Sequence, residues 1–309
     1  MRLVESPEVF LVQQPSLDWD EIRRYLRKVG ERTNGVDSPE VWADRVQESM
    51  AADGDAIVEF GGRLCYRSWV AGANVNVVKV REDSKDYLAN VLRSGHGSVT
   101  EHANYSFIMD DVSRVFTHEL VRHRAGVAVS QESMRFVRLD DIPFWMPPWA
   151  RSDEELTRRS MKLLEAMEEH QLWMADRFGL DDMEPCPVCD GSGEVPTGSD
   201  DDGPLTFGDE PCPACDGKGQ VIKNFAEKKH KTSFMRRFAP DGVATGMLVT
   251  INIRALRHII YMRSALGAEE EIRIVFDDVA RIMQQASPNL MQDYSPNEDL
   301  EWIPAWLKV

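Results

Sequence analysis

The chain of 309 residues contains 36 Lys and Arg against 52 Asp and Glu, which gives a formal net charge of −16. With 42% hydrophobic and 28% charged residues, it has the composition of an ordinary globular protein of one large or two smaller domains. So acidic a chain has no broad basic face, which excludes general binding to nucleic acid or to anionic membranes. No apolar run approaches the ~20 residues of a membrane span and no signal-like segment opens the sequence, so we expect a cytoplasmic protein.

The spacing of apolar residues predicts helices and strands in alternation along the chain. Helices are expected over residues 18–29, 41–52, 56–66, 86–93, 113–124, 153–178, 225–238, 254–264 and 268–286. Strands or extended segments are expected over residues 9–12, 105–109, 134–139 and 247–251. Gly95 and Gly97 argue against a helix over residues 95–102. The tail over residues 288–309, with its Trp and Pro residues, is expected to pack as an irregular arm.

Residues 181–222 are rich in Gly, Pro and Asp and contain four of the five cysteines. One pattern occurs twice, as Cys186-Pro-Val-Cys189-Asp-Gly-Ser-Gly193 and as Cys212-Pro-Ala-Cys215-Asp-Gly-Lys-Gly219. It resembles the cysteine-rich repeats of the Hsp40 co-chaperones, over these residues only. Each Cys-x-x-Cys pair offers two thiolates to one metal, and four thiolates suit tetrahedral Zn²⁺. We therefore expect an inserted module with a structural, zinc-ribbon-like site, formed by Cys186, Cys189, Cys212 and Cys215.

A docking site for a partner or a nucleic-acid knuckle is the functional alternative for this module. The acidic residues between the two cysteine pairs argue against nucleic acid, because they would repel phosphates. They are Asp200, Asp201, Asp202, Asp209 and Glu210.

The triplet Arg122-His123-Arg124 predicts a site for a small anion. From residue 114 to residue 138 there are five arginines and only two acids, in a chain that is otherwise strongly acidic. The planar guanidinium group donates paired hydrogen bonds to phosphate and carboxylate groups. The alternative is a solvated helix end, where cations are favoured by the helix dipole.

Polar residues also gather at residues 95–102, at 236–237 and at 252–263. In the first segment His96, Glu101 and His102 could bind a metal, although their spacing is not that of the His-Glu-x-x-His helix. In the last segment Arg254 and His258 are four residues apart and share one face of a helix. Together these segments favour a ligand with several phosphate or carboxylate groups.

Cys65 is the one cysteine outside the module. Its place in the apolar pattern of a helix favours packing in the core. A thiol nucleophile whose pKa is lowered by Arg63 and Arg67 is the alternative.

Over about residues 55–290, apart from the cysteine module, the ordered motifs resemble those of the flavin-dependent thymidylate synthases. The matching segments are Gly95-His96, Glu101-His102, Ser113-Arg114, Leu120 to Arg124, Ser130 to Phe136, Arg236 to Pro240, Asn252-x-Arg254, Arg263 and Ala268 to Arg273. The resemblance implies an α/β (α+β) fold with a central, mostly antiparallel sheet flanked by helices. Residues 1–180 and 223–309 would form the flavin- and nucleotide-binding catalytic domain, and residues 181–222 the insertion. The family implies homotetramers whose active sites are shared between subunits.

The same resemblance implies a methyltransferase of nucleotide biosynthesis that uses FAD to convert dUMP to dTMP by reductive methylation at C5. Methylenetetrahydrofolate would supply the carbon, and NADPH would reduce the flavin. The partners would be these small molecules and further copies of the chain, with no nucleic acid and no membrane. No cysteine nucleophile is needed, which agrees with packing of Cys65 in the core.

The resemblance also assigns site residues, by motif. Catalytic roles fall to Arg263, which would favour the ionised form of the uracil, and to His96, near flavin and folate. The residues implied in cofactor binding are Ser98, Arg122, His123, Arg124, Gln131, Asn252, Arg254 and His258. Those implied in substrate binding are Glu119, Arg122, Gln131, Glu132, Ser133, Met134, Arg135, Arg236 and Arg263, with Ser133, Arg135 and Arg236 reaching the dUMP phosphate from a neighbouring subunit.

The sequence departs from the family pattern in four places. Eight residues, not seven, separate the Arg-His-Arg triplet from Ser133, and Glu119 stands where Gln is common. Phe136 replaces Tyr, and Gly267 stands where His is common. These departures leave open a related reaction, either methylation of dCMP or formation of a hydroxymethyl group. A noncatalytic nucleotide-binding scaffold with a zinc docking module is the alternative from a different class.

Overall fold

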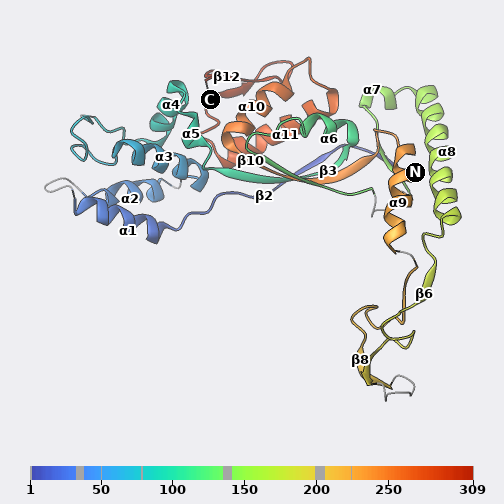
Figure 1. The fold of residues 1–309 in the computed structure, drawn as a ribbon. Coiled ribbons are helices and arrows are strands. Elements are labelled where there is room, and N and C mark those ends of the chain that lie inside the picture. The colour runs from blue at the N-terminus through green and yellow to red at the C-terminus, as the bar shows by residue number, and fades with distance from the viewer. Residues whose placement is uncertain are drawn as a thin grey trace. The chain divides into compact units, whose positions relative to one another are not determined.

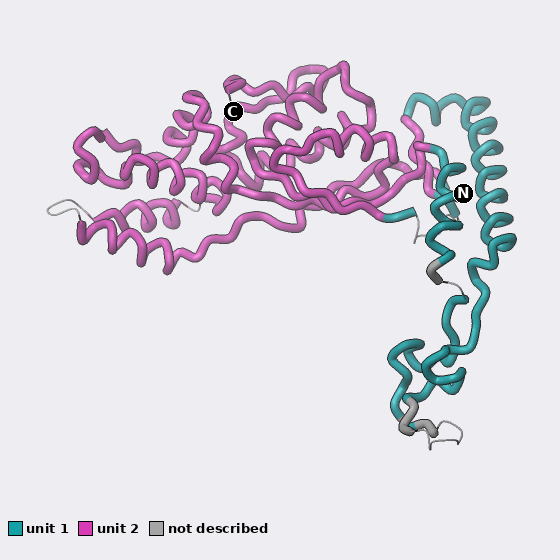
Figure 2. Tube along the Cα trace, viewed as in Figure 1, with its two compact units in different colours: residues 1–2, 133–142, 148–240 teal, residues 3–132, 143–147, 241–309 magenta. Residues whose placement is uncertain are grey.

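The computed structural model of the chain describes residues 2–32, 38–49, 51–77, 79–134, 141–198, 206–223 and 225–308. The chain forms two compact units, drawn in two colours in Figure 2. Unit 1 comprises residues 1–2, 133–142 and 148–240, and unit 2 comprises residues 3–132, 143–147 and 241–309. No helix in the described ranges is long and apolar enough to cross a membrane.

A four-stranded antiparallel sheet lies at the centre of unit 2 (Figure 1). Its strand order is β2 (Glu8–Gln13), β3 (Asn104–Ser113), β10 (Ala244–Asn252) and β4 (Val127–Gln131). β10 pairs with β3 from Ala244 opposite Ser113 to Asn252 opposite Asn104. It also pairs with β4, where Ile251 lies opposite Val127. The predicted antiparallel sheet is confirmed, but β4 was not predicted, because none of its residues is buried and its apolar signal is weak.

Apart from α5, the helices of unit 2 agree with the prediction to within a few residues at most ends. They are α1 (Trp19–Gly30), α2 (Glu40–Glu48), α3 (Asp53–Tyr66), α4 (Ser84–Ser94), α5 (Gly97–Thr100), α6 (Arg114–Leu120), α10 (Ile253–Ser264) and α11 (Glu270–Ala286). Side-chain caps fix several starts: Asp18 accepts from the Glu21 amide at 3.0 Å and Ser113 accepts from the Phe116 amide at 3.1 Å. α6, α10 and α11 lie together against the sheet (Figure 1).

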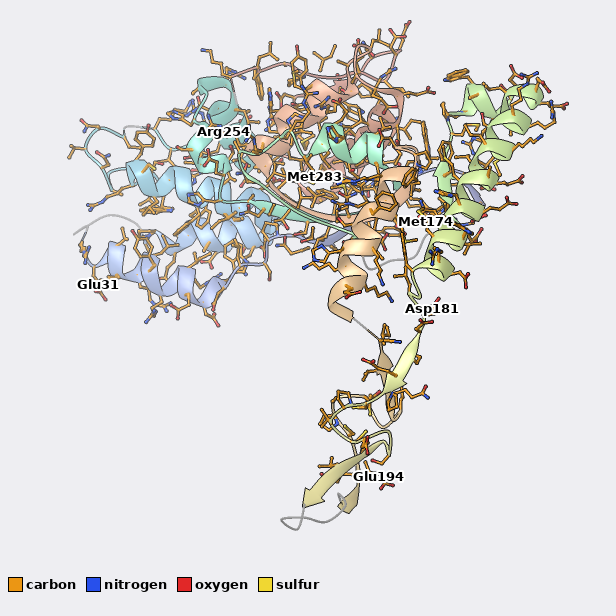
Figure 3. The ribbon with its side chains drawn as sticks, turned by 45° about the vertical axis from the view of Figure 1, so that its right-hand side comes forward. Glu31, Met174, Asp181, Glu194, Arg254 and Met283 are labelled. Carbon is orange, nitrogen blue, oxygen red and sulfur yellow. The ribbon has the colours of Figure 1, made fainter. Side chains whose placement is uncertain are left out.

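The main core of unit 2 forms where α6, α10 and α11 meet the sheet. Phe107, Phe116 and Phe276 are completely buried there. Met283, labelled in Figure 3, closes the same core from α11. A second cluster lies between α1, α2 and α3 around Trp42, which is also completely buried. Burial of this much aromatic and aliphatic surface is the main force that holds the helices on the sheet.

Two local predictions around the polar motifs were wrong. Gly97–Thr100 form one helical turn, although the glycines argued against a helix. Val99 and Thr100 are buried, and the Thr100 hydroxyl donates to the Gly97 carbonyl at 2.7 Å, so tertiary packing overrides local propensity. α6 ends at Leu120, so the Arg-His-Arg triplet follows the helix instead of lying on it.

The C-terminal tail is more regular than the predicted irregular arm. β11 (Tyr294–Pro296) and β12 (Trp302–Pro304) form an antiparallel pair. Trp302 is 1% exposed, and its indole N–H donates to Asp277 at 2.8 Å. Asp293 accepts two hydrogen bonds from the buried Arg257, at 2.8 and 3.0 Å. These contacts fasten the tail to α10 and α11.

Unit 1 contains α7 (Pro148–Arg151), α8 (Glu154–Arg177), α9 (Phe225–Met235) and a 3₁₀ turn (Arg236–Phe238). The predicted helix over 153–178 is confirmed and begins after Asp153, which accepts from the Leu156 amide at 3.0 Å. The predicted helix over 225–238 is confirmed, with a tighter last turn. The extended segment predicted at 134–139 lies, apart from Met134, outside the described residues.

The cysteine module is built from two antiparallel strand pairs. β6 (Met183–Pro185) pairs with β9 (Gln220–Ile222), and β7 (Glu194–Gly198) pairs with β8 (Thr206–Pro211). Figure 3 labels Asp181 at the start of the module and Glu194 in β7. Outside these pairs, β1 (Arg2–Val4) and β5 (Pro143–Trp145) form a further two-stranded sheet.

Candidate active site

A cavity of about 770 Å³ in unit 2 brings together residues from distant parts of the chain. It is lined by the loop after α6, the first turns of α10, Glu101 after α5, and the tail. Six of the eight residues predicted to bind the cofactor line it: Arg122, His123, Arg124, Asn252, Arg254 and His258. The remaining lining residues are Glu101, Ala125, Gly126, Ala255, Ile259, Leu307 and Lys308.

The sheet register explains why these segments meet. β10 runs directly into α10, and Asn252 joins them by accepting from the Ala255 amide at 2.9 Å. The Asn252 backbone N–H donates to the Gly126 carbonyl at 3.0 Å. The loop before β4, which carries the Arg-His-Arg triplet, is therefore held beside the N-terminus of α10.

The cavity is electropositive in an acidic chain. Arg122, Arg124, Arg254 and Lys308 line it, and Glu101 is the one acid in the lining. Glu101 forms a 2.6 Å salt bridge with Arg254. The N-terminus of α10 adds the partial positive charge of its helix dipole, although the amides of Ile253 and Ala255 already donate to the Ala103 carbonyl and to Asn252. This donor set fits the diphosphate of FAD, the cofactor that the sequence resemblance implies.

Gly97 allows α5 to approach the guanidinium group of Arg254. A Cβ atom at this position would lie 2.7 Å from Nε of Arg254 and 2.8 Å from its Cζ. Any larger residue would push Arg254 away from its place in the cavity wall. Gly97, the second glycine of the Gly95-His96-Gly97 segment, thus has a packing role at the site.

Arg263 lies behind this cavity and is held by two residues of the α6 region. Its Nε donates to Nε2 of His123 at 2.8 Å, and its Nη1 donates to Oε2 of Glu119 at 2.7 Å. Its Nη2 donates to the Glu119 carbonyl at 3.1 Å. The side chain is 16% exposed. Arg263 does not line the cavity, but it is hydrogen-bonded to His123, which does.

His123 is held in its neutral form. Partial burial and the positive charge of Arg263 lower the pKa of His123 below its ordinary value. Because Arg263 always donates, Nε2 of His123 must accept, which places the ring proton on Nδ1. The ring of His258 lies 6.5 Å away, centroid to centroid.

Glu119 faces cations of its own chain. Besides its bonds to Arg263, it lies 3.4 Å from Nη1 of Arg122. An acid beside a nucleotide phosphate would be unfavourable, but here its charge is balanced by two arginines. The replacement of Gln by Glu at this position thus has a structural partner in Arg263.

A second cavity of about 440 Å³ in unit 2 contains His96 and Ser98. The ring of His96 lies 6.0 Å from that of Tyr66. Ser98 is therefore not in the lining of the first cavity with the other predicted flavin residues. Gln131 lines neither cavity and donates to the Thr117 hydroxyl at 3.3 Å.

Cys65 also lines the second cavity and is exposed, so its predicted packing in the core is wrong. The buried face of α3 carries a polar pair instead, in which Arg63 donates to Glu59 at 2.7 Å and both side chains are completely buried. Apolar periodicity could not reveal this, because the residues that face the core are charged.

The residues predicted to bind the substrate are divided between the two units. In unit 2, a carboxylate oxygen of Glu132 accepts from the Gly246 amide at 3.2 Å and lies 3.4 Å from the Thr245 hydroxyl. Ser133, Met134 and Arg236 belong to unit 1. Arg135 and Phe136 lie outside the described residues. The roles of all these residues remain predictions.

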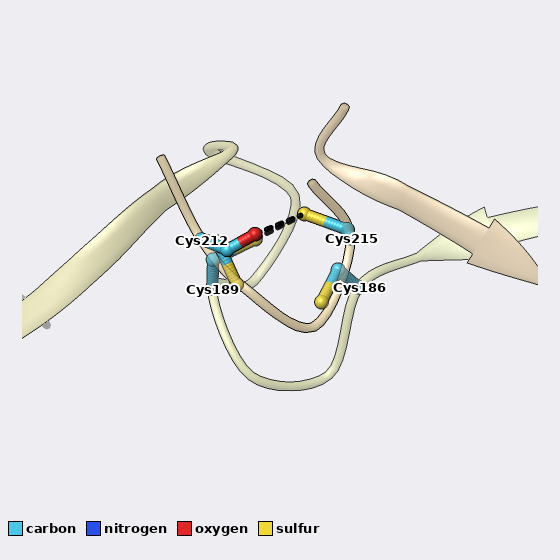
Figure 4. A group of neighbouring side chains, drawn as sticks. All are labelled: Cys186, Cys189, Cys212 and Cys215. Carbon is cyan, nitrogen blue, oxygen red and sulfur yellow. Dashed lines mark hydrogen bonds between the residues drawn. The ribbon is translucent and has the colours of Figure 1, made fainter. Parts of the chain in front are cut away.

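The four predicted zinc ligands gather in unit 1 (Figure 4). All four are buried, and their sulfur atoms lie within 4.8 Å of one another. The Sγ atoms of Cys189 and Cys215 are 3.7 Å apart. Tetrahedral Zn–S bonds of about 2.3 Å place sulfur atoms roughly 3.8 Å apart, so the cluster fits zinc.

The two cysteine repeats close each other's turns. The Cys186 amide donates to the Gly219 carbonyl at 2.9 Å, and the Cys212 amide donates to the Gly193 carbonyl at 2.8 Å. Gly193 and Gly219 both have positive φ, and a Cβ on either would lie within 2.5 Å of a backbone oxygen of the other repeat. These two positions therefore require glycine.

Among the described residues, the four cysteines form the one group of three or more side chains that could hold a metal ion. The metal site considered at His96, Glu101 and His102 is therefore not formed. Glu101 binds Arg254 instead, and His102 packs against the helix face at Gly61.

Sequence reasoning missed two contributions to the site. Leu307 and Lys308 reach the first cavity from the tail, a contribution that no sequence pattern indicated. Glu271 is buried, and its carboxylate accepts from the Ser113 amide at 2.6 Å and from the Ser113 hydroxyl. Burial raises the pKa of Glu271 to about 7. Glu271 belonged to a matching motif, but the pattern did not reveal that it ties α11 to the start of α6.

An arginine-lined cavity at a helix N-terminus, beside an antiparallel sheet, is typical of proteins that bind a phosphorylated cofactor. Residues 46–289 match the family described as thymidylate synthase complementing protein, and the chain belongs to that family.

Its curated relatives include the flavin-dependent thymidylate synthase of Mycobacteroides abscessus, 31% identical over 244 residues, which are 79% of this chain and 81% of the relative. The enzyme of the same name from Mycobacterium sp. (strain JLS) is 30% identical over 247 residues, 80% of this chain and 82% of the relative. The predicted family and enzyme class, a methyltransferase, are confirmed.

A solved structure with a similar fold is the UMP/dUMP methylase PolB from Streptomyces cacaoi bound with 5-Br dUMP. Its TM-score is 0.55 at 14% identity, over 94% of this chain and 96% of that chain. At this identity the similarity concerns the fold alone, and it agrees with the predicted α/β class.

Proposed function

We propose that the protein is an FAD-dependent enzyme that methylates dUMP at C5 to form dTMP, with methylenetetrahydrofolate as the carbon donor and NADPH as the reductant. The observation that carries this proposal is the convergence of six residues, predicted from family motifs, on one electropositive cavity. Family membership and the names of the relatives support the reaction type.

Bound FAD would supply hydride transfer, and the residues of this chain would supply binding and electrostatics. Arg122, Arg124 and Arg254 would bind its phosphates, together with the N-terminus of α10. Among the described residues, three of the five N–H groups of Arg263 have partners, which leaves two for a ligand. Donated to the carbonyl edge of a pyrimidine, these groups would stabilise negative charge that develops on the ring.

We further propose a cytoplasmic homotetramer with shared active sites and a structural zinc in the cysteine module. Unit 1 supports the assembly, because it carries exposed apolar side chains that suit a protein interface. They include Trp149, Leu163, Leu172 and Trp173, which are 64%, 59%, 50% and 58% exposed. The predicted phosphate ligands Ser133 and Arg236 belong to the same unit.

Methylation of dCMP is a second candidate reaction, and Glu119 is the observation that favours it. Within the part of the chain that the structure describes, its Oε1 has a single contact, at 3.4 Å to Arg122. A carboxylate with spare acceptor capacity could accept from the exocyclic amine of cytosine, which uracil lacks. The negative charge of Glu119 also partly cancels the positive charge of Arg263, so Arg263 would stabilise an ionised uracil less.

The test is the absorbance spectrum of the purified protein, followed by mass analysis of the product from dUMP or dCMP with methylenetetrahydrofolate and NADPH. We expect bound flavin and a methyl group added to dUMP. A hydroxymethyl product or turnover of dCMP alone would replace the proposed reaction by the related one. A protein that binds no flavin would instead support the noncatalytic scaffold.

The variant Arg263→Ala sharpens this test. It should retain flavin, because Arg263 does not line the flavin cavity, and lose turnover by at least about 100-fold. Loss of flavin together with activity would contradict the role assigned to Arg263.

A further inference from the structure

The tail of the chain contributes to the first cavity from outside the stretch that matches the family. The family match ends at residue 289, whereas Leu307 and Lys308 line the cavity. The other cations of the lining, Arg122, Arg124 and Arg254, all lie within the match. Lys308 is therefore a positive charge at the cavity that the matched stretch does not supply.

The tail segment, residues 305–308, is anchored to α10 through Asp293. The Ala305 amide donates to the Asp293 carbonyl at 3.0 Å, and the Trp306 amide donates to the Asp293 carboxylate at 3.2 Å. The same carboxylate accepts two hydrogen bonds from Arg257, a completely buried residue of α10. Because the first turns of α10 line the cavity, the tail segment is fastened to an element that forms the cavity wall.

A second set of contacts holds the tail segment against the turn between α4 and α5. The Arg93 guanidinium group lies over the Trp306 ring, 5.1 Å from its centroid. Gly95 has a φ of +76°, and a Cβ atom at this position would lie 3.1 Å from Cβ of Lys308. The backbone at Lys308 is therefore packed in place, and the flexible end of its side chain can adjust to a ligand.

Lys308 differs from two arginines of the cavity in its charge balance. Arg254 forms a 2.6 Å salt bridge with Glu101, and Nη1 of Arg122 lies 3.4 Å from Glu119. Lys308 is exposed and forms no salt bridge with another described residue. An ammonium group without a carboxylate partner can bind a phosphate without giving up an existing ion pair.

We propose that Lys308 binds a phosphate group of the flavin cofactor and that the tail segment completes the cofactor site. This inference rests on the proposed function, which assigns FAD to the cavity. Leu307 supports it, because this side chain lines the cavity and is 67% exposed, so a bound cofactor would cover apolar surface. Lysine binds phosphate as a point charge, so the affinity that Lys308 contributes depends on the phosphate and decreases with salt.

The experiment is a titration of the full-length protein, freed of bound flavin, with FAD, FMN and riboflavin. In Lys308→Gln the affinity for FAD should fall at least about tenfold, while the affinity for riboflavin, which has no phosphate, stays unchanged. A loss with FMN as well assigns Lys308 to the phosphate next to the ribityl chain, and a loss with FAD alone assigns it to the phosphate of the adenylate half. Lys308→Arg should retain most of the affinity, because it keeps the charge.

Lys28→Gln is the matched control, because Lys28 is an exposed lysine of α1 that does not line the cavity. Equal affinities of Lys308→Gln and this control for FAD would overturn the proposal. An equal loss of affinity for riboflavin would also overturn it, since Lys308 would then act on the shape of the site and not on a phosphate.

The titration needs no turnover, so it separates this inference from the proposed function. Weaker FAD binding by Lys308→Gln, in a protein whose wild type makes no dTMP, would contradict the proposed function and leave this inference standing. Unchanged FAD binding by the variant, in a protein whose wild type makes dTMP, would contradict this inference alone.

Discussion

At the scale of single residues, Arg263 is held from two sides by groups with opposite effects. Glu119 neutralises its charge, whereas His123 accepts a hydrogen bond without adding charge. Both partners thus fix the orientation of the Arg263 side chain, but only Glu119 reduces its net positive charge. Glu119 is the residue at which the motif comparison predicts a departure from the family pattern in the charge near the site.

Glu119→Gln is expected to change the preference between pyrimidines. An amide oxygen can still accept from Arg263, but it no longer balances the guanidinium charge. An ionised uracil would be better stabilised, so kcat/KM should rise several-fold for dUMP and fall for any turnover of dCMP. Steady-state kinetics with both nucleotides measure this ratio.

Glu119→Ala serves as the control, since it removes both the charge and the acceptor and should lower kcat with either nucleotide. Equal changes for dUMP and dCMP in Glu119→Gln would show that Glu119 does not influence the choice of base.

At the scale of elements, the contact between Ser113 and Glu271 couples α6 to α11 in a pH-dependent way. Burial favours the protonated form of Glu271 and raises its pKa from 4.5 to about 7 in the folded chain. This group therefore contributes its full stabilisation below pH 4.5, and the contribution is lost as the pH rises through about 7.

Glu271→Gln should weaken this dependence, because the amide keeps a neutral hydrogen-bonding group at the position. We expect the free energy of unfolding of the wild-type protein to fall more steeply from about pH 5 to about pH 7 than that of the variant. Urea unfolding at several pH values measures the difference. Some dependence should remain from Asp55, whose pKa burial raises to about 6. Identical slopes in the two proteins would contradict the assignment.

The cysteine module offers a second prediction at this scale. Cys186→Ser should lower the zinc content and unfold the module, since the three remaining thiols would bind zinc more weakly and a small insertion without its metal is poorly stabilised. The flavin should remain bound, because its cavity belongs to unit 2.

Metal analysis and limited proteolysis measure both effects. Cys65→Ser, at a cysteine outside the cluster, is the control and should keep its zinc. A fully folded, zinc-loaded Cys186→Ser protein would rule out the four-thiolate site.

Sequence periodicity predicted most helices because their caps and apolar faces are local features. Asp18, Asp83 and Ser113 each cap a helix at a predicted start or within three residues of it. β4 and α5 could not be predicted in the same way, because their conformations depend on β10 and on Arg254, which are far away in the chain. The expectation for Cys65 was wrong for a different reason, since the buried face of α3 carries the charged pair Glu59 and Arg63, which apolar periodicity does not detect.

At the scale of the whole molecule, family motifs identified most of the flavin cavity but not the contribution of the tail. Arg122, Arg254 and His258 could be assigned because their patterns are distinctive. Lys308 could not, since its place depends on how β11, β12 and Trp302 pack on α10 and α11. The residues predicted to act across a subunit boundary remain predictions for the assembled protein.

Trp173→Asp tests that assembly. Trp173 is 58% exposed on α8, and a charge there should weaken an apolar interface. We expect a smaller species in light scattering and at least about a tenfold loss of kcat, because shared sites would be incomplete.

Val41→Asp, at an apolar residue of unit 2 that is 50% exposed, should leave both properties unchanged. A Trp173→Asp protein with unaltered mass and activity would place the subunit interface elsewhere.

The mutual closure of the two cysteine repeats constrains how the module could have arisen. Each turn is completed by a carbonyl group of the other copy. A gene with a single copy would therefore encode a turn that lacks its hydrogen-bond acceptor. Gain or loss of the insertion in related genes is therefore expected in one event that includes both copies.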